Sequence, residues 1–473
     1  MNRILAIVLG LILIVIISVG LYLWRISNLP VDYSDIGEHF KYGSIGSEPV
    51  SGVPYWIWRV LPVMFPEKLP GKGYASLGFL VEPGKETPIG FSERTVYIKR
   101  VGLNCAVCHA GTYRASLDSE PVLVLGMPAN HLDLQGYIDF LTKCALDSRF
   151  SPEYIMPAIK GIGGRLNPFE AFIYENIAIY RTRDALIKQG NQLALLMTNR
   201  WGPGRVDTFN PYKALKFDFP MDKLPPEELI GATDLPSIWN QAPRQGMQLH
   251  WDGDNTSVEE RNKSAALGAG VTPTTIDLPR IGRIEKWLLN LPAPKYPFPI
   301  NEALVTTGKQ IYMQSCADCH AFGSAKVGKV TPIEEIGTDP HRLDSYTYEC
   351  LSNQNTLYAG YPWRFQYFRK TNGYANQPLD GIWLRGPYLH NGSVPTLRDL
   401  LEPVERRPAK FYRGYDVYDQ KNVGFYSNVP EEKGHQYFLF DTTIPGNSNR
   451  GHLYGVDLSP EQKDALVEYM KTL

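Results

Sequence analysis

The sequence lacks an excess of charge of either sign. Its 473 residues include 48 Lys and Arg against 49 Asp and Glu, which gives a net charge of -1. A protein that binds nucleic acid would show a basic excess, so nucleic acid is excluded as a partner. Hydrophobic residues make up 43% and charged residues 21% of the chain, which excludes an intrinsically disordered protein. The length predicts two domains rather than one core.

Long hydrophobic runs are also lacking, with one exception at the amino end. Residues 4–24 carry no charge, and a run of about 20 apolar residues can cross a bilayer as a helix. Arg3 precedes the run and favours a cytoplasmic amino terminus. A cleavable signal peptide is the alternative, because Ser18-Val19-Gly20 offers small residues to a peptidase. Because the run continues past this point, we expect residues 1–25 to form a single-pass anchor in the cytoplasmic membrane, with the rest periplasmic.

Cysteine is scarce, and four of the six cysteines are arranged in two matching motifs. The chain reads Cys105-Ala106-Val107-Cys108-His109 and again Cys316-Ala317-Asp318-Cys319-His320. The spacing C-x-x-C-H is the attachment motif of c-type haem. Two thiols reach the vinyl groups of one porphyrin, and the adjacent histidine presents its imidazole to the iron.

The alternatives for these motifs are a redox dithiol or half of a zinc site. A thioredoxin-like dithiol does not need the following histidine, and a zinc site needs four ligands gathered together. The sequence therefore predicts two c-type haems. The remaining Cys144 and Cys350 either bridge the domains or stay buried as thiols, and a structural calcium ion stays open as well.

The pattern around the second motif predicts a small cytochrome c domain. Residues 301–314 read as an amphipathic helix that leads into the motif. Residues 459–473 begin with Ser459 as N-cap and Gln462 three positions later, which is a capping box. In cytochrome c domains the first and last helices cross and pack. Four prolines in residues 291–300 predict a stiff extended linker.

We therefore predict a mainly α fold with long irregular loops and two cytochrome c-like domains behind the anchor. The expanded amino-terminal haem domain covers residues 26–295, and the carboxy-terminal cytochrome c domain covers residues 296–473. Helices are expected at residues 132–144 and 169–197. An internal echo supports duplication of a haem-binding unit, because residues around Trp239 and His250 recur around Trp383 and His390.

At these motifs the chain resembles the bacterial di-haem cytochrome c peroxidase superfamily. The two C-x-x-C-H sites carry the resemblance, together with residues 249–253 (LHWDG), 386–392 (GPYLHNG) and 395–397 (PTL). Residues 200–212 (RWGPGRVDTFNPY) are similar to the branch of di-haem rubber and fatty-acid oxygenases. The resemblance implies an oxidoreductase whose first haem activates dioxygen or peroxide and whose second haem is six-coordinate and relays electrons. It also implies that Trp251 lies between the haems, although a packed aromatic beside a porphyrin is an equal alternative.

One departure favours the oxygenase-like interpretation. Peroxidases of this group place a catalytic Glu after the W-D-G segment, because a general acid/base must move a proton between the peroxide oxygens. The corresponding residues 264–273 (SAALGAGVTP) contain no acid.

The second iron needs a further His or Met ligand. The only methionine after the second motif is Met470, and the histidines are His341, His390, His435 and His452. We favour His452, because its Gly- and Asn-rich loop can bring the ring to the iron, and the resemblance also implies two histidine ligands there. His390 is the alternative.

At the first iron, Met127 or His131 could close the site, or both are loop or packing residues and the iron stays open beneath an apolar cover such as Phe209. Arg205 and Arg385 are candidates for haem propionates, with surface salt bridges as the alternative.

The expected partners are the membrane, an electron-donor or electron-acceptor protein or the quinol pool, and a small-molecule oxidant or substrate. The alternative function is a non-catalytic electron carrier with both haems six-coordinate.

Overall fold

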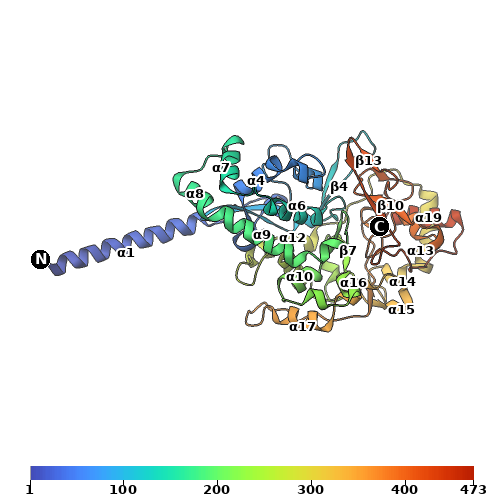
Figure 1. The fold of residues 1–473 in the computed structure, drawn as a ribbon. Helices are drawn as coiled ribbons and strands as arrows, with labels where there is room; N and C mark the ends of the chain where they lie inside the picture. Colours follow the sequence, from blue (N-terminus) through green and yellow to red (C-terminus); the bar gives the residue numbers. More distant parts are fainter. Residues whose placement is uncertain (1) are drawn as a thin grey trace.

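A long amino-terminal helix leads into a body of short helices, small strand pairs and loops (Figure 1). The computed structural model describes residues 2–473, and the side chains of residues 2, 4, 6 and 23–27 are outside the description. The helices of the first part are α1 (Asn2–Ser27), α2 (Ile36–Tyr42), α3 (Glu48–Ser51), α4 (Tyr55–Met64), α5 (Ala106–His109), α6 (Leu134–Leu146), α7 (Pro152–Gly161), α8 (Pro168–Ile173), α9 (Ile179–Leu193), α10 (Asn210–Leu215), α11 (Val258–Gly268) and α12 (Leu278–Asn290).

The second part, from residue 302 on, is built in the same way. Its helices are α13 (Glu302–Ser315), α14 (Ala317–His320), α15 (Ile333–Ile336), α16 (His341–Ser345), α17 (Tyr348–Thr356), α18 (Leu397–Leu400) and α19 (Pro460–Met470). Short 3-10 helices occur in both parts, at Pro66–Lys68, Tyr74–Leu77, Leu196–Thr198, Met221–Lys223, Pro226–Leu229, Ala242–Arg244, Ile382–Leu384 and Val404–Arg406.

The strands are short and antiparallel. They are β1 (Val53–Pro54), β2 (Phe91–Val96), β3 (Ile98–Leu103), β4 (Ala110–Tyr113), β5 (Val122–Leu125), β6 (Arg205–Asp207), β7 (Ala232–Asp234), β8 (Val330–Pro332), β9 (Gly373–Ala375), β10 (Lys410–Arg413), β11 (Tyr418–Asp419), β12 (Gly424–Phe425), β13 (Glu431–Glu432), β14 (His435–Gln436) and β15 (Phe438–Asp441). One sheet has three strands in the order β1-β3-β2, with Phe91 opposite Leu103, and the others are pairs.

The predicted membrane anchor needs correction. α1 projects from the body, and the described side chains along it, such as Leu11 and Ile16, are exposed. The apolar run expected at residues 4–24 includes residues 4, 6, 23 and 24, whose side chains lie outside the description. Within the described residues no helix combines the length and the apolar character of a membrane span. The predictions of a transmembrane helix and of a single-pass location in the cytoplasmic membrane are therefore wrong for this part of the chain.

Two of the expected helices form with shifted boundaries. The segment predicted at residues 132–144 is α6, which starts after the N-cap Asp133. The segment predicted at residues 169–197 is interrupted. α8 gives way to a π-helical turn at Tyr174–Ala178, and α9 then continues to Leu193.

The crossing of the first and last helices of the second part is confirmed. α13 and α19 lie together in Figure 1, and a Cβ added at Gly308 would sit 1.9 Å from the main-chain oxygen of Ala465. Only a glycine allows the two backbones to approach this closely. The predicted capping box also forms, because Ser459 accepts the N–H of Gln462 and the Gln462 side chain accepts the N–H of Ser459.

The proline-rich segment at residues 291–300 has no helix or strand, but it is packed rather than free. Its Leu291 carbonyl accepts the N–H of Asn240 at 2.7 Å, and its Pro294 carbonyl accepts the Trp383 indole N–H at 2.7 Å. The ring of Tyr296 lies 5.4 Å from that of Trp383. The segment therefore joins the two parts through a shared core.

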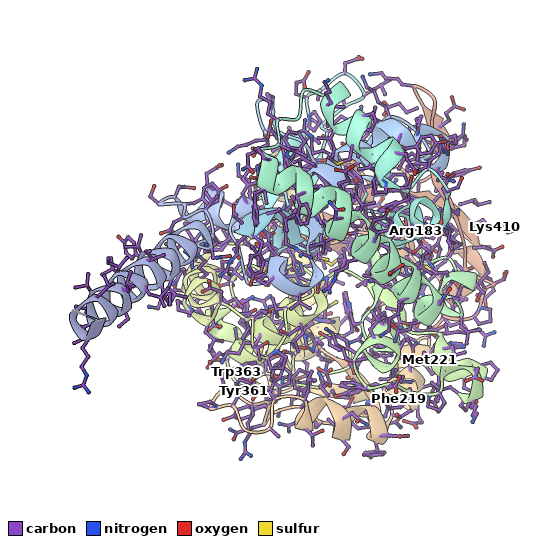
Figure 2. The ribbon with its side chains drawn as sticks, turned by 60° about the vertical axis from the view of Figure 1, so that its left-hand side comes forward. Arg183, Phe219, Met221, Tyr361, Trp363 and Lys410 are labelled. Carbon is purple, nitrogen blue, oxygen red and sulfur yellow. The ribbon has the colours of Figure 1, made fainter. Side chains whose placement is uncertain are left out.

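Apolar cores cross the expected domain boundary elsewhere as well. One core contains Met127 and Trp239 from the first part with Leu466 from the second. Another joins Phe40 and Ala106 to an aromatic group at residues 358–368. In that group Tyr361 and Trp363 lie beside each other, with ring centroids 5.5 Å apart (Figure 2). The division at residues 295 and 296 stays a prediction.

Candidate haem-binding sites

The first C-x-x-C-H motif forms a single helical turn, α5, between strands β3 and β4. The Asn104 side chain accepts the N–H of Ala106, the first residue of this turn, at 3.0 Å. Gly90, with φ of 93°, packs against it, because a Cβ there would lie 2.5 Å from Val107 Cα. These contacts fix the two thiols and the following histidine in one rigid unit.

His109 is oriented by its neighbours in the way that a metal-bound histidine requires. Its Nδ1 donates to the Pro236 carbonyl at 3.0 Å, which leaves Nε2 as the nitrogen that can bind a metal. Burial lowers the pKa of His109 to about 3, and the Arg261 charge adds to this effect. The imidazole is therefore neutral at pH 7, with a free lone pair.

The second motif repeats this arrangement. α14 follows directly on α13, and Nδ1 of His320 donates to the Gln377 carbonyl at 2.8 Å. Burial lowers the pKa of His320 below its ordinary value. Burial also raises the pKa of Cys105 and of Cys316 to about 11, so these thiols are protonated.

His452 faces His320. The ring centroids of the two histidines are 6.2 Å apart. Metal–imidazole bonds are about 2.0 Å, and each ring centre lies about 1.1 Å behind its nitrogen, so two rings on one metal have centres about 6 Å apart. Burial first, and then the neighbouring His320, lower the pKa of His452 to about 3. The spacing and the neutral state of both rings fit one iron held between them.

The backbone holds His452 in place. Its φ is 50°, an unusual value for histidine, and its N–H donates to the Ile336 carbonyl at 2.8 Å. The Arg407 guanidinium donates to the carbonyls of Asn449, Gly451 and His452. One buried arginine therefore fixes the loop that carries this imidazole.

His390, the alternative ligand, lies in a different environment. Its ring stacks on Tyr374 with centroids 3.9 Å apart, and its carbonyl accepts the N–H of Asp234 at 2.9 Å. Burial lowers the pKa of His390 to about 3.

Comparison with known proteins bears on the segment that follows the second motif. A family described as RoxA-like, cytochrome c-like, matches residues 373–413, which include Gln377, Arg385 and His390. The match indicates a haem cytochrome. It supports a relationship to the di-haem oxygenases and peroxidases over this small region, and a cytochrome c-like domain implies haem iron.

Two relatives come from Sinorhizobium fredii (strain NBRC 101917 / NGR234). Uncharacterized protein y4iM is 31% identical over 293 residues, which covers 53% of this chain and 66% of that protein. Uncharacterized protein y4iJ is 26% identical over 510 aligned residues, which covers 85% of this chain and 81% of that protein.

The residues present fit haem at both motifs. Each motif histidine has Nδ1 bound to a carbonyl and Nε2 left for iron. At the second motif the ring of His452 stands at the distance that one shared iron requires. Haem bound there would be held by the thioethers of Cys316 and Cys319 and by the imidazoles of His320 and His452.

The surroundings of the first motif differ. All nine histidines lie in the described part of the chain, and none has a ring that pairs with His109 as His452 pairs with His320. Met127 is fully buried in an apolar core, and its Sδ lies 3.0 Å from where a Cβ on Gly111 would be. His131 binds Asn130 at 2.9 Å through Nδ1, while its Nε2 is enclosed without a partner in the described structure. Burial lowers the pKa of His131 to about 4.

Phe209 is buried and stacks on Tyr346, with ring centroids 4.3 Å apart. The Arg342 guanidinium lies over the Phe209 ring at 4.5 Å and forms an ion pair with Asp252 at 2.8 Å. Phe209 is thereby linked to the W-D-G loop.

Trp251 lies on a continuous path of bonds between the two motif histidines. Its indole N–H donates to the Asp234 carbonyl at 2.8 Å, and two residues further on the Pro236 carbonyl accepts from His109. On the other side, the carbonyl of the preceding His250 accepts the Gln377 side-chain N–H at 3.3 Å. The Gln377 carbonyl in turn accepts from His320. No residue pattern points to Gln377 or Pro236, because their roles depend on main-chain carbonyls, which every residue has.

The two arginines expected at propionates are occupied by protein groups. Arg205 donates to the carbonyls of Trp201 and Ala232 and to the Asn447 side chain. Arg385 donates to the carbonyls of Pro378 and Asp380 and pairs with the Asp380 carboxylate at 2.9 Å.

The two cysteines outside the haem motifs do not meet. Cys144 and Cys350 are free thiols buried in different apolar clusters. Among the described residues, no group of three or more His, Cys, Asp or Glu is arranged to hold a metal ion.

Proposed function

We propose that this protein is a di-haem c-type cytochrome that acts as an oxidoreductase. The first haem, on His109, activates dioxygen or peroxide, and the second haem, between His320 and His452, relays electrons. The observation that carries the proposal is the contrast between the two motif histidines, because only His320 has a second imidazole at ligand distance. Haem iron supplies one-electron chemistry and, where a position is open, a site for an oxygen species.

The bonded path through Trp251 supports electron transfer from the second haem to the first. The indole N–H joins the segment that orients His109, and Gln377 joins the same loop to the carbonyl that orients His320. One connected set of hydrogen bonds therefore orients both imidazoles, and the Trp251 ring lies along it, between the carbonyls of Pro236 and Gln377 that bind them. A rigid connection of this kind limits the rearrangement that accompanies electron transfer.

Two acids near the W-D-G loop, Glu260 and Asp252, are occupied by other contacts, which argues against their use in peroxide cleavage. Glu260 on α11 accepts the main-chain N–H groups of Gln366 and Tyr367 at 2.6 and 3.0 Å. Asp252 is buried in its ion pair with Arg342. Neither carboxylate is free to move a proton between two peroxide oxygens, which peroxide cleavage requires.

The surface beside His452 supports an external redox partner there, either a protein or a quinol. A hollow of about 470 Å³ is lined by apolar side chains such as Ile336 and Leu453 together with Tyr454 and the charged Glu335 and Arg450. Leu453 and Tyr454 are exposed. Exposed apolar and aromatic side chains beside charged ones suit contact with a partner.

Carbon monoxide binding tests the proposal. The reduced protein, with two haems shown by mass, should bind about one carbon monoxide per chain, because only the first iron has an open position. A spectrum with high-spin and low-spin haem in equal amounts would agree. If the reduced protein binds no carbon monoxide and both haems are low-spin, the protein is an electron carrier and the enzymatic function is refuted.

A further inference from the structure

Helix α11 carries a buried arginine with no partner. Arg261 is 8% exposed, and its guanidinium forms no hydrogen bond and no ion pair with any residue of the described chain. By contrast, Arg205 and Arg385 each make several hydrogen bonds, and their Nε atoms are enclosed by protein. No nitrogen of Arg261 is enclosed in this way. Burying a charge without a counterion costs free energy, so we expect an anion to bind this guanidinium.

Arg261 lies beside the first haem motif. Ala266 and Leu267, further along α11, pack in the same apolar core as Ala106 of that motif. The charge of Arg261 is also close enough to His109 to contribute to the low pKa of that imidazole. Both observations put Arg261 in the neighbourhood of the imidazole that would hold the first iron.

Two further arginines make this region positive. Arg244 and Arg385 both pair with the one carboxylate of Asp380, and both lie close enough to affect the charge of Arg261. The other nearby acid, Asp254, is bound to His250 at 2.5 Å through Oδ1, and its Oδ2 is enclosed without a hydrogen-bond partner. Three guanidinium groups therefore stand against two carboxylates, which leaves one positive charge without a counterion.

We propose that Arg261 is the anchor for a propionate carboxylate of the first haem. A guanidinium can hold a carboxylate through two parallel N–H···O bonds, and a haem brings two such carboxylates. This inference rests on the proposed function and assigns the role to a residue other than the two arginines expected from the sequence.

The test compares the haem-loaded Arg261→Gln and Arg261→Lys variants of the full chain with an Arg181→Gln control. Arg181 is exposed on α9. Removing a positive charge at a propionate favours ferric iron. At a fixed potential, Arg261→Gln should shift the oxidised-to-reduced ratio of one haem about tenfold, a fall of about 59 mV in its midpoint potential. Arg261→Lys should restore most of the shift, and the control should show none.

The outcomes separate this inference from the proposed function. If mass analysis finds no haem on the unaltered protein, the proposed function fails and the anchor fails with it. If both haems are attached and Arg261→Gln titrates like the unaltered protein, only the anchor is overturned. Loss of one haem in Arg261→Gln but not in Arg261→Lys supports it. Should both variants fail to fold, resonance Raman spectra of the unaltered protein decide: a propionate bending band that shifts in D₂O supports the anchor, and one that does not shift overturns it.

Discussion

Replacing His452 with alanine should convert the second haem from low spin to high spin and leave the first unchanged. The rings of His320 and His452 are 6.2 Å apart, which leaves about 2 Å for each bond to a shared iron. An alanine side chain ends at Cβ and cannot bridge this gap. The main chain should stay in place, since the N–H of residue 452 donates to Ile336 and Arg407 binds its carbonyl. The whole of one haem, half of the iron in the protein, should therefore lose its sixth ligand.

Optical and electron paramagnetic resonance spectra of the oxidised His452→Ala protein measure this change directly. Titration of the reduced protein with carbon monoxide provides a count, which should rise from about one to about two per chain, because both irons then have an open position. His390→Ala is the matched control, because His390 is the alternative ligand and is also buried. A low-spin second haem in His452→Ala, or its conversion in His390→Ala instead, would refute the assignment of His452.

Three further changes test the surrounding structure. Gly308→Ala should lower the free energy of unfolding by about 3 kcal/mol in urea denaturation, because its Cβ would overlap a carbonyl of α19. Gly282→Ala on α12 has open space around it and should be neutral or stabilising. Gln377→Leu keeps the main-chain carbonyl that orients His320 but loses two side-chain hydrogen bonds. We expect both haems to attach, and the free energy of unfolding to fall by about 1 kcal/mol per lost bond. Electron equilibration between the haems after flash photolysis should be slower; an unchanged rate would contradict a path through Gln377. Burial holds the pKa of His390 at about 3, below the ordinary value of about 6.5, so the unfolded chain binds the extra proton between these values. The share of the stability that His390 contributes is complete above pH 6.5 and falls by about 2 kcal/mol by pH 5. His390→Gln should remove this share, so denaturation measured at both pH values should show a loss of stability about 2 kcal/mol smaller than in the unaltered protein; an equal loss would contradict the prediction.

Local features of this protein could be predicted from neighbouring residues. The two C-x-x-C-H motifs each lie within five consecutive positions, so the chemistry of haem attachment is visible without a fold. The capping box at Ser459 and the helix leading into the second motif are equally local, and both form. Hydropathy at the amino end was less informative, because it predicted a membrane span that the described part of α1 does not provide.

The sixth position of each iron, by contrast, depends on which loops meet in space. His452 and His390 both follow the second motif on loops, and their spacing along the chain does not distinguish them. The fold does so, by bringing one ring to 6.2 Å from His320 and stacking the other on Tyr374. The arginines are a second example. Nothing in the sequence distinguishes Arg205, Arg261 and Arg385 as candidates for a haem propionate, and the packing of the described residues shows which guanidinium lacks a partner. Covalent haem attachment depends on adjacent residues and can be predicted from them. Iron coordination and charge pairing depend on segments that lie far apart in the sequence and meet only in the folded protein.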